Sequence, residues 1–390
     1  MNARLEIRWR SLVTVGVVCL TGCGTNPSAH KGIETSHYTV PEQVNDGWST
    51  ADVRNVGLDN WQIENLLGQI KNGTYKNIHS FLIVKNGKLA VEEYFPGQEE
   101  DGRHQEYGRD TLHGIHSATK SVNSILVGIA IAQHRISQVD AKVSALLPEY
   151  SDLFTNREKD EIRLKHLLSM TAGLSWAEWG VPYTDAHNDH VAMNRSADPV
   201  RYVLDKPLVT AQGTKFNYSS GISIALGEVV YKSSGLRPDK FAEEHLFKPL
   251  GILNYQWLKY PNGMVQTGGG LYMRPRDMAK IGYLFLNGGR WQGKQIVSEE
   301  WIRESTKQQA PDAQYGYQWW LGRLRAGDQA VLTVGAQGRR GQFILILPEL
   351  QMVAVFTSWN EGNGLTEQPI DMLQRFVIPA ALQSPPNNPK

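Results

Sequence analysis

The chain has 390 residues, of which 41% are hydrophobic and 20% are charged, and its formal net charge is +1 at pH 7. This length allows one large domain with a sizeable core, or two interleaved ones. The near-neutral charge argues against a nucleic-acid partner, because such proteins need a strongly basic face.

The first 22 residues are typical of a bacterial secretory signal. Three arginines within the first ten residues precede the apolar run 11–20, which is too short to cross a bilayer as a helix. Leu20-Thr21-Gly22-Cys23 resembles the lipobox of bacterial lipoproteins, which implies cleavage before Cys23 and lipidation of that residue. A plain signal peptide cut nearby is the alternative. We therefore expect export to the periplasmic side of the cell envelope, and by the same resemblance Gly24 favours the outer membrane.

The sequence contains two cysteines, Cys19 and Cys23. If Cys19 leaves with the signal, the body of the protein has no cysteine pair for a disulfide, no thiol nucleophile and no Cys-based metal site. Residues 23–45 mix Ser, Pro, Thr, Asn and Gly without periodicity and predict a flexible tether. Residues 383–390 predict a disordered tail.

Hydrophobic periodicity in the remaining chain predicts strands near both ends and helices between them. Asn86-Gly87 lies between two apolar runs and predicts a hairpin over residues 79–95. Three strands with short antiparallel connections are expected near the C-terminus. The expected helices cover 58–71, 121–134, 164–170, 222–231, 277–286 and 367–382, and the expected C-terminal strands cover 330–334, 342–347 and 352–357.

This order of elements predicts an α/β (α+β) fold. An antiparallel sheet built from both chain ends is flanked by terminal helices, and an all-helical subdomain is inserted in the middle. The expected domain covers residues 46–382, with its α/β part at about 46–110 and 265–382 and its helical part at about 111–264. A cleft between the two parts is the natural place for a site.

Ser117 is the candidate nucleophile. Serine needs a neighbouring base, and Lys120 follows three residues later, on the same face of an expected helix. A buried lysine has a lowered pKa and can accept the serine proton near neutrality. The pattern alone is weak, since residues 28–31 match it too, but the apolar helix after Lys120 distinguishes Ser117.

Two later segments complete the candidate site. Tyr218-Ser219-Ser220 lies in a loop before an expected helix, where a tyrosine can relay a proton and Ser220 can orient the lysine or the substrate. The segment from Val334 to Gly338 ends a strand with small residues, which let a substrate backbone approach closely. A plain glycine turn between two strands explains that segment equally well.

In this order, the three motifs resemble those of the serine β-lactamase and penicillin-binding protein superfamily. The segments 167–174, 267–271, 276–282 and 315–320 strengthen the resemblance, which extends from about Asn45 to Leu382. It implies a β-lactamase-like fold, Ser117 as the acylated nucleophile, Lys120 as its base and Tyr218 as the proton relay. It also implies an oxyanion hole made by the backbone N–H groups of Ser117 and Arg339.

Departures from the family pattern indicate the subgroup. Ala336-Gln337-Gly338 stands where β-lactamases have Lys-Thr-Gly, and the missing lysine argues against efficient β-lactam turnover. No glutamate motif like that of class A enzymes is visible. The closest resemblance is to 6-aminohexanoate-oligomer hydrolases and related esterases, which work without a metal or cofactor. Further candidate substrate-binding residues are Ser220, Ala336, Gly338, Trp179 and Trp359.

Histidines offer two competing interpretations. His113 and His116 flank the nucleophile, but no Gly-x-Ser-x-Gly elbow surrounds Ser117, so we expect His116 to be structural. The run Asp185 to His190 contains acidic and histidine residues that suggest a metal site. A solvated loop is the favoured interpretation, because no helix fixes the spacing.

We therefore expect a serine hydrolase that cleaves an ester or linear amide through an acyl-enzyme. The alternatives are a D-amino-acid peptidase or weak β-lactamase acting on cell-wall-type substrates, and a catalytically silent binding lipoprotein of the same fold. The expected substrate is a small ester, amide or short peptide. The intact set of Ser117, Lys120 and Tyr218 weighs against the silent alternative.

Overall fold

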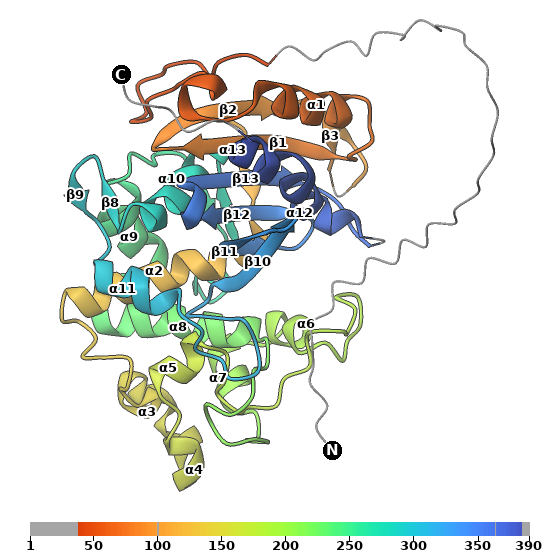
Figure 1. Cartoon of the computed structure of the whole chain (residues 1–390). Coiled ribbons are helices and arrows are strands. Elements are labelled where there is room, and N and C mark those ends of the chain that lie inside the picture. The colour runs from red at the N-terminus through yellow and green to blue at the C-terminus, as the bar shows by residue number, and fades with distance from the viewer. Residues whose placement is uncertain (1–37, 100, 363, 384–390) are drawn as a thin grey trace, which may run out of the picture.

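The computed structural model describes residues 38–99, 101–362 and 364–383 (Figure 1). The expected signal peptide, Cys23 and residues 384–390 lie outside the described residues, so the predictions made for them stay predictions. Within the described ranges, no helix is long and apolar enough to cross a membrane.

A six-stranded antiparallel sheet forms one half of the molecule, with strand order β10-β11-β12-β13-β1-β2. The first hairpin thus pairs with the last strand, as Phe81 opposite Phe356 shows. The strands are β1 (Ile78–Lys85), β2 (Lys88–Tyr94), β10 (Trp320–Ala326), β11 (Gln329–Gly338), β12 (Gln342–Leu347) and β13 (Met352–Ser358).

The sequence-based prediction of this sheet is confirmed. The hairpin turn has positive φ at both Asn86 and Gly87, as its Asn-Gly sequence predicts. Strand β11 runs four residues beyond the predicted end at residue 334, and the edge strand β10 was not predicted. Short strands also pair elsewhere, as β3 (Gly97–Gln98) with β4 (His104–Gln105), β5 (His113–Gly114) with β7 (Leu271–Met273), β7 with β6 (Tyr255–Trp257), and β8 (Arg290–Trp291) with β9 (Lys294–Gln295).

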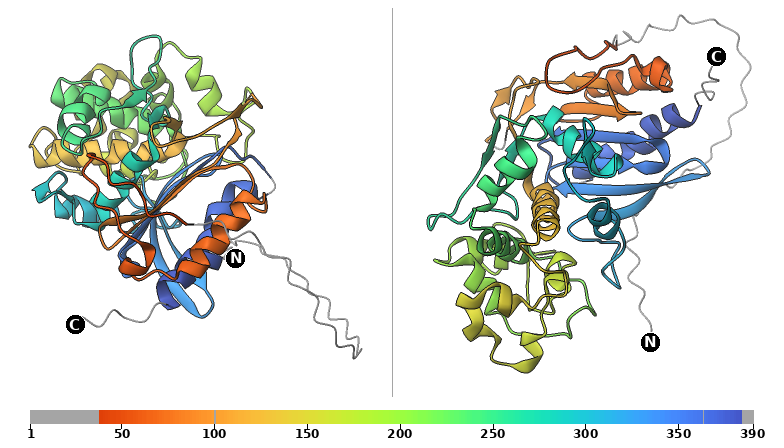
Figure 2. Two further views of the ribbon diagram at one scale, coloured as in Figure 1. Left: turned by 90° about the horizontal axis from the view of Figure 1, so that it is seen from above. Right: turned by 90° about the vertical axis from the view of Figure 1, so that its left-hand side faces the viewer.

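Helices cover both faces of the sheet, so the central strand β13 is buried along its whole length. The chain-terminal helices pack on one face, where they enclose an apolar cluster with β1 and β13. Helices α2 and α10 pack on the other face (Figures 1 and 2). The first face carries η1 (Val53–Val56), α1 (Asn60–Lys71), η6 (Leu365–Glu367), α12 (Gln368–Met372), the π-helical turn η7 (Leu373–Val377) and α13 (Ile378–Gln383), and the second carries α2 (Thr119–Ala132), α10 (Pro275–Leu286) and the nearby α11 (Glu299–Ser305).

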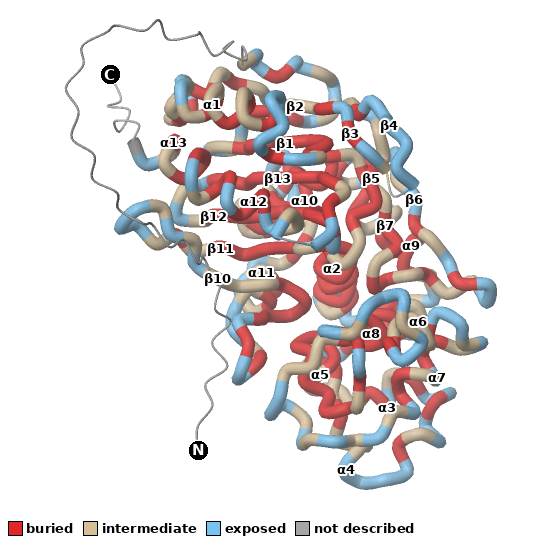
Figure 3. The backbone as a smooth tube through the Cα atoms, turned by 90° about the vertical axis from the view of Figure 1, so that its right-hand side faces the viewer, coloured by how far each residue is buried: buried red, intermediate tan, exposed pale blue. Residues whose placement is uncertain are grey.

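The middle of the chain forms the helical half of the molecule, at the bottom of Figure 1. Helix α2 lies between this half and the sheet, and Figure 3 shows it buried along nearly its whole length. Its Asn123 side chain donates to Ser223 O of α8 at 3.0 Å. The elements of this half are α3 (Val143–Leu146), η3 (Pro148–Phe154), α4 (Arg157–Asp160), α5 (Leu164–Leu168), α6 (Asp189–Asn194), α7 (Pro199–Leu204), α8 (Ser220–Ser234), α9 (Pro238–Ala242) and the π-helical turn η4 (Glu243–Phe247), and η5 (Pro348–Leu350) joins β12 to β13.

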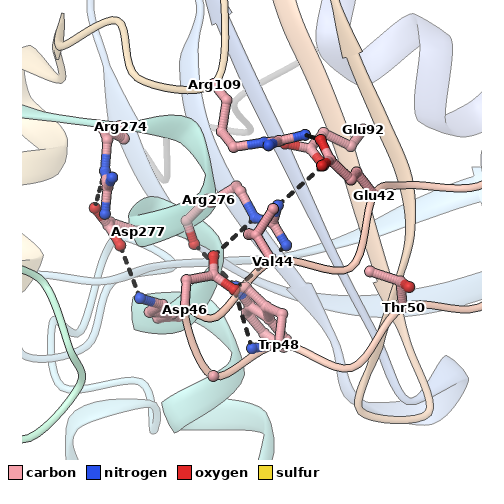
Figure 4. Close-up of polar contacts among 12 residues, drawn as sticks. Glu42, Val44, Asp46, Trp48, Thr50, Glu92, Arg109, Arg274, Arg276 and Asp277 are labelled. Carbon is pink, nitrogen blue, oxygen red and sulfur yellow. Dashed lines mark hydrogen bonds and ion pairs between the residues drawn. The ribbon is translucent and has the colours of Figure 1, made fainter.

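A buried ion-pair network connects the N-terminal segment to the sheet and to α10 (Figure 4). Arg276, which is 1% exposed, pairs with Asp46 at 2.9 Å and with Glu92 of β2 at 3.4 Å. The Trp48 indole N–H also donates to Arg276 O at 3.3 Å. Because charges away from water need opposite charges beside them, these contacts fix residues 46–48 on the domain.

The same segment corrects the expected tether. Residues 38–45 are not a free linker, because the Tyr38 hydroxyl donates to Ala90 O at 2.8 Å and accepts from Val53 N at 3.1 Å. Glu42 forms an ion pair with Arg109 at 2.9 Å. The ordered domain therefore begins by Tyr38 rather than at residue 46. Residues 23–37 lie outside the described residues.

The buried network predicts a large effect of Arg276→Met on stability. The substitution removes the buried partner of the Asp46 carboxylate and one of the two arginines beside Glu92, the other being Arg109, and breaking a buried ion pair costs about 3–5 kcal/mol. We expect a loss of this size in the free energy of unfolding, measured by urea denaturation. Arg325→Met removes an exposed arginine from β10 and serves as the control, and equal shifts for both variants would contradict the role given to the network.

Candidate active site

Ser117 lies in the tight turn η2 (His116–Ala118), which leads directly into α2. His116 adopts a φ of +46°, in the left-handed region that residues with a side chain rarely occupy. Ala118 N donates to Ile115 O at 3.1 Å and closes the turn. The strained turn thus fixes the direction in which Ser117 leaves the backbone, and such strain concentrates at functional sites.

Lys120 lies in the first turn of α2 and is 2% exposed. Its ammonium nitrogen Nζ is 3.1 Å from Ser117 Oγ and donates to Gly268 O at 2.5 Å. Burial lowers the pKa of Lys120 to about 8, because desolvation disfavours the charged form, although the nearby Glu178 carboxylate acts in the opposite direction. The amine is therefore positioned and poised to take a proton from the serine.

Tyr218 approaches Ser117 from the loop before α8. Asn217 N donates to Met170 O at 2.8 Å, which ties this loop to the end of α5, and the Ser219 side chain caps α8 by accepting from Ile222 N. Burial and the Glu178 carboxylate raise the pKa of Tyr218, although the interaction of the phenol with the Ser117 side chain acts to lower it. The phenol is therefore protonated and able to donate.

The end of strand β11 packs against the nucleophile turn. A Cβ placed on Gly338 would lie 2.2 Å from Ile115 O, so only glycine allows this approach. The next residue, Arg339, lines the cleft, and its guanidinium lies 4.8 Å from the ring centre of Tyr183 and pairs with Glu361 at 2.7 Å. The strand motif and the Ser-x-x-Lys motif are thus in direct contact.

Ser117 and Tyr218 open into a cleft of about 1300 Å³. One wall is aromatic. Trp179 is 63% exposed, and its ring centre lies 5.4 Å from that of Tyr218 and 5.5 Å from that of Trp320. A large exposed aromatic side chain beside a nucleophile provides an apolar surface for a substrate.

Sequence analysis did not find Glu178, which also lines the cleft and is 2% exposed. Its carboxylate accepts hydrogen bonds from Trp176 Nε1 at 2.7 Å, from the Tyr183 hydroxyl at 3.0 Å, and from Ser220 N and Oγ at 2.8 and 2.6 Å. Burial raises its pKa, but Lys120 and the Ser220 hydrogen bonds outweigh that effect and lower it. A fixed anion therefore lies close to the candidate base.

Three of the expected substrate-binding residues do not line the cleft, whereas Trp179 and Gly338 do. Ala336 faces the apolar core between the sheet and α2, because alternate residues of β11 point to opposite sides. Ser220 is 2% exposed and binds Glu178 instead of a substrate. The centre of the Trp359 ring lies 5.2 Å from that of His116, and the Arg340 guanidinium lies 4.2 Å from the centre of the Trp359 ring.

His113 belongs to a buried pair under the nucleophile turn. Its Nε2 lies 2.9 Å from His79 Nδ1, and the His79 ring stacks on Tyr107 with centres 3.9 Å apart. Burial lowers the pKa of His79 to about 3 and that of His113 to about 4, so both imidazoles are neutral at pH 7. The two rings are thus joined as neutral hydrogen-bonding groups.

The expected solvated loop over residues 185–190 is only partly correct. His187 is exposed, but Asn188 is fully buried and caps α6 by accepting from His190 N. The Asp189 carboxylate accepts hydrogen bonds from Lys206 Nζ at 2.5 Å, through Oδ1, and from Ala177 N at 2.7 Å, through Oδ2. The segment therefore anchors the loop that carries Glu178. Among the described residues, no group of three or more His, Cys, Asp or Glu is arranged to hold a metal ion.

Comparison with known proteins places this arrangement in a family. The family model described as Beta-lactamase matches residues 79–370, which is most of the chain. The chain belongs to the beta-lactamase family.

The family relatives include hydrolases of several kinds. The 6-aminohexanoate-dimer hydrolase of Paenarthrobacter ureafaciens is 24% identical over 309 residues, which are 73% of each chain. A Bacillus anthracis structure provisionally named 6-aminohexanoate-dimer hydrolase superposes with a TM-score of 0.67 at 20% identity, covering 82% of this chain and 83% of that one. A family VIII carboxylesterase has a TM-score of 0.59 at 18% identity, covering 80% and 95%. This beta-lactamase-family protein is therefore a serine hydrolase, and the fold predicted from its sequence is confirmed.

Proposed function

We propose that this protein hydrolyses an ester or a linear amide through an acyl-enzyme on Ser117. The observation that carries the proposal is the 3.1 Å contact between the buried Lys120 amine and Ser117 Oγ. An amine with a pKa of about 8 is a competent base near neutral pH, since a general base works best when its pKa lies near the operating pH.

In the proposed acylation, neutral Lys120 takes the proton of Ser117 while Oγ attacks the substrate carbonyl carbon. The resulting oxyanion accepts hydrogen bonds from the backbone N–H groups of Ser117 and Arg339, each worth about 2.7–4 kcal/mol in the transition state. Tyr218 passes its proton to the departing alcohol or amine and is reprotonated by the Lys120 ammonium, while the carbonyl re-forms as the ester bond to Ser117. Water then attacks this ester and gives a proton to the neutral Lys120, which returns it to Ser117 Oγ as the acid departs.

The choice of ester or linear amide over β-lactam rests on two observations. Ala336 is buried in the core, so position 336 offers no cation to the carboxylate of a penicillin. Two of the relatives named above are, by their names, a 6-aminohexanoate-dimer hydrolase and a carboxylesterase. Both observations favour an open-chain substrate over a β-lactam.

We also propose that the enzyme is exported and carried on the periplasmic side of the cell envelope by a lipid on Cys23. The support is the sequence Leu20-Thr21-Gly22-Cys23 behind a short apolar run. The described part of the domain begins at Tyr38, about fifteen residues after the proposed anchor.

The proposed nucleophile predicts a single covalent adduct. Intact mass after treatment with a fluorophosphonate should show one added group on the wild type and none on Ser117→Ala. Hydrolysis of p-nitrophenyl butyrate should be lost in the same variant and should exceed nitrocefin hydrolysis in the wild type. A folded wild-type protein with neither adduct nor turnover would favour the silent binding lipoprotein.

The proposed base predicts a pH dependence with a definite sign. The neutral amine is the active form, so kcat/KM should rise as the pH rises through about 8 and then level off. Lys120→Ala and Tyr218→Phe should each lower kcat/KM by about 100-fold or more, the usual contribution of a positioned proton-transfer group. Near-normal turnover in Lys120→Ala, with a wild-type circular dichroism spectrum, would remove Lys120 from the mechanism.

The proposed anchor predicts incorporation of fatty acid at Cys23. Cells fed an alkyne-tagged palmitate should label the wild-type protein and not Cys23→Ser. The labelled protein should sediment with the outer membrane after separation of the two membranes. Equal labelling of both proteins would exclude Cys23 as the site of attachment.

A further inference from the structure

The cleft does not end at the nucleophile but continues over the face of the sheet on which the chain-terminal helices pack. Beyond Trp320, its lining residues come from three neighbouring strands, β10, β11 and β12. We call this second part of the cleft the sheet trough, and define it by Gly322, Leu324, Thr333, Gln337, Phe343 and Leu345.

Strand register shows that these six residues form one continuous surface. Gly322 pairs with Thr333 between β10 and β11, and Gln337 pairs with Phe343 between β11 and β12. Residues two apart on a strand share a face, so Leu324 joins Gly322 on the same side. Leu345 and Phe343 belong to the apolar cluster of that face.

The floor of the sheet trough carries no charge. Four of its six residues are apolar or glycine, and the other two are Thr333 and Gln337. Ile370 of α12 adds an apolar wall. The charged residues that line the cleft beyond Trp320 lie at its rim, where Arg323 is 57% exposed and Glu367 is also exposed. A charged substrate chain would therefore find no opposite charge on the floor. An apolar chain gives up no hydrogen bonds with water when it is buried there.

Gly322 keeps the β10 side of the trough open. A Cβ on this residue would meet a single neighbour, the Thr333 hydroxyl at 3.4 Å, so a larger side chain would project into the cleft rather than into the core. Glycine in a strand interior often marks a place where a ligand approaches the backbone closely.

We propose that the sheet trough binds a long, uncharged, apolar arm of the substrate, so that the enzyme prefers esters or amides with an extended hydrocarbon chain. This inference rests on the proposed function and specifies its substrate class. From Gln337 to Thr333 the floor extends about 13 Å along β11, four residues at the rise of a strand. A butyryl group is much shorter than this floor, whereas a chain of eight to twelve carbons is comparable to it in length.

The test is the chain-length profile of the full-length enzyme. We expect kcat/KM to rise at least about tenfold from p-nitrophenyl butyrate to p-nitrophenyl octanoate, since each methylene removed from water is worth up to about fourfold. The profile for dodecyl acetate against butyl acetate shows whether the long arm belongs to the alcohol instead of the acid. A wild-type enzyme with no chain-length preference in either series would overturn the inference.

Substitutions on β10 locate the effect. Gly322→Leu should abolish the preference for octanoate over butyrate, because its side chain fills the trough. Arg325→Leu adds the same side chain to the same strand at an exposed position that does not line the cleft, and it should keep the wild-type ratio. A preference that survives in a folded Gly322→Leu variant would overturn the assignment to this trough.

A third measurement does not depend on any variant folding. The wild type should form its Ser117 adduct faster with a dodecyl fluorophosphonate than with an ethyl one, and equal rates would contradict the inference.

The proposed function and the proposed role of the sheet trough fail in different ways. Turnover that is independent of chain length refutes the trough alone, whereas no adduct and no ester turnover refute the proposed function and the trough with it.

Discussion

The buried cation Lys120 organises the active site of this molecule. The Lys120 ammonium group is removed from water between the sheet and the helical half, and an unpaired charge in such a place costs several kcal/mol. The surrounding backbone and side chains therefore have to provide oxygen atoms at short distance. Gly268 O meets this need directly, and it can do so because residue 268 has no side chain: a Cβ there would lie 3.0 Å from Ser220 O. Ser117 Oγ is the other oxygen within reach. The same short contact therefore stabilises the buried lysine and places a base beside the serine.

Glu178 balances the same charge from a greater distance. Four hydrogen bonds fix its carboxylate, so its position does not depend on Lys120. Desolvation favours the neutral amine and Glu178 favours the ammonium, and the resulting pKa of Lys120 is about 8. At pH 7 such a group is neutral in about one molecule in ten, a fraction large enough for catalysis and small enough to keep the lysine paired most of the time. Tyr183, which binds Glu178, also lines the cleft together with Trp179, so charge balance and substrate surface are built from one segment.

Local sequence patterns predicted much of the fold and the three motif residues, because those features depend on near neighbours in the chain. The helix after Lys120 and the Asn86-Gly87 hairpin are of this kind. Glu178 was missed because its role comes from contacts made across the chain, such as that with Ser220, 42 residues away. Ala336 was misassigned because a motif does not reveal which face of its strand meets the core. Strand β10 was missed because, as a half-exposed edge strand with two arginines, it has only a weak apolar alternation.

The strand order has a consequence for how the chain reaches its native state. Ser80 of β1 bonds to Thr357 of β13 across 277 residues, so the first hairpin has no permanent partner until almost the entire chain is available. Closing such a long loop is entropically costly, and proteins dominated by contacts of this range fold slowly. The helical half, whose contacts are far more local, can form without waiting. During synthesis the β1 edge thus stays exposed after the nucleophile turn has been made, and the active site is completed only when β11, β12 and β13 close the sheet.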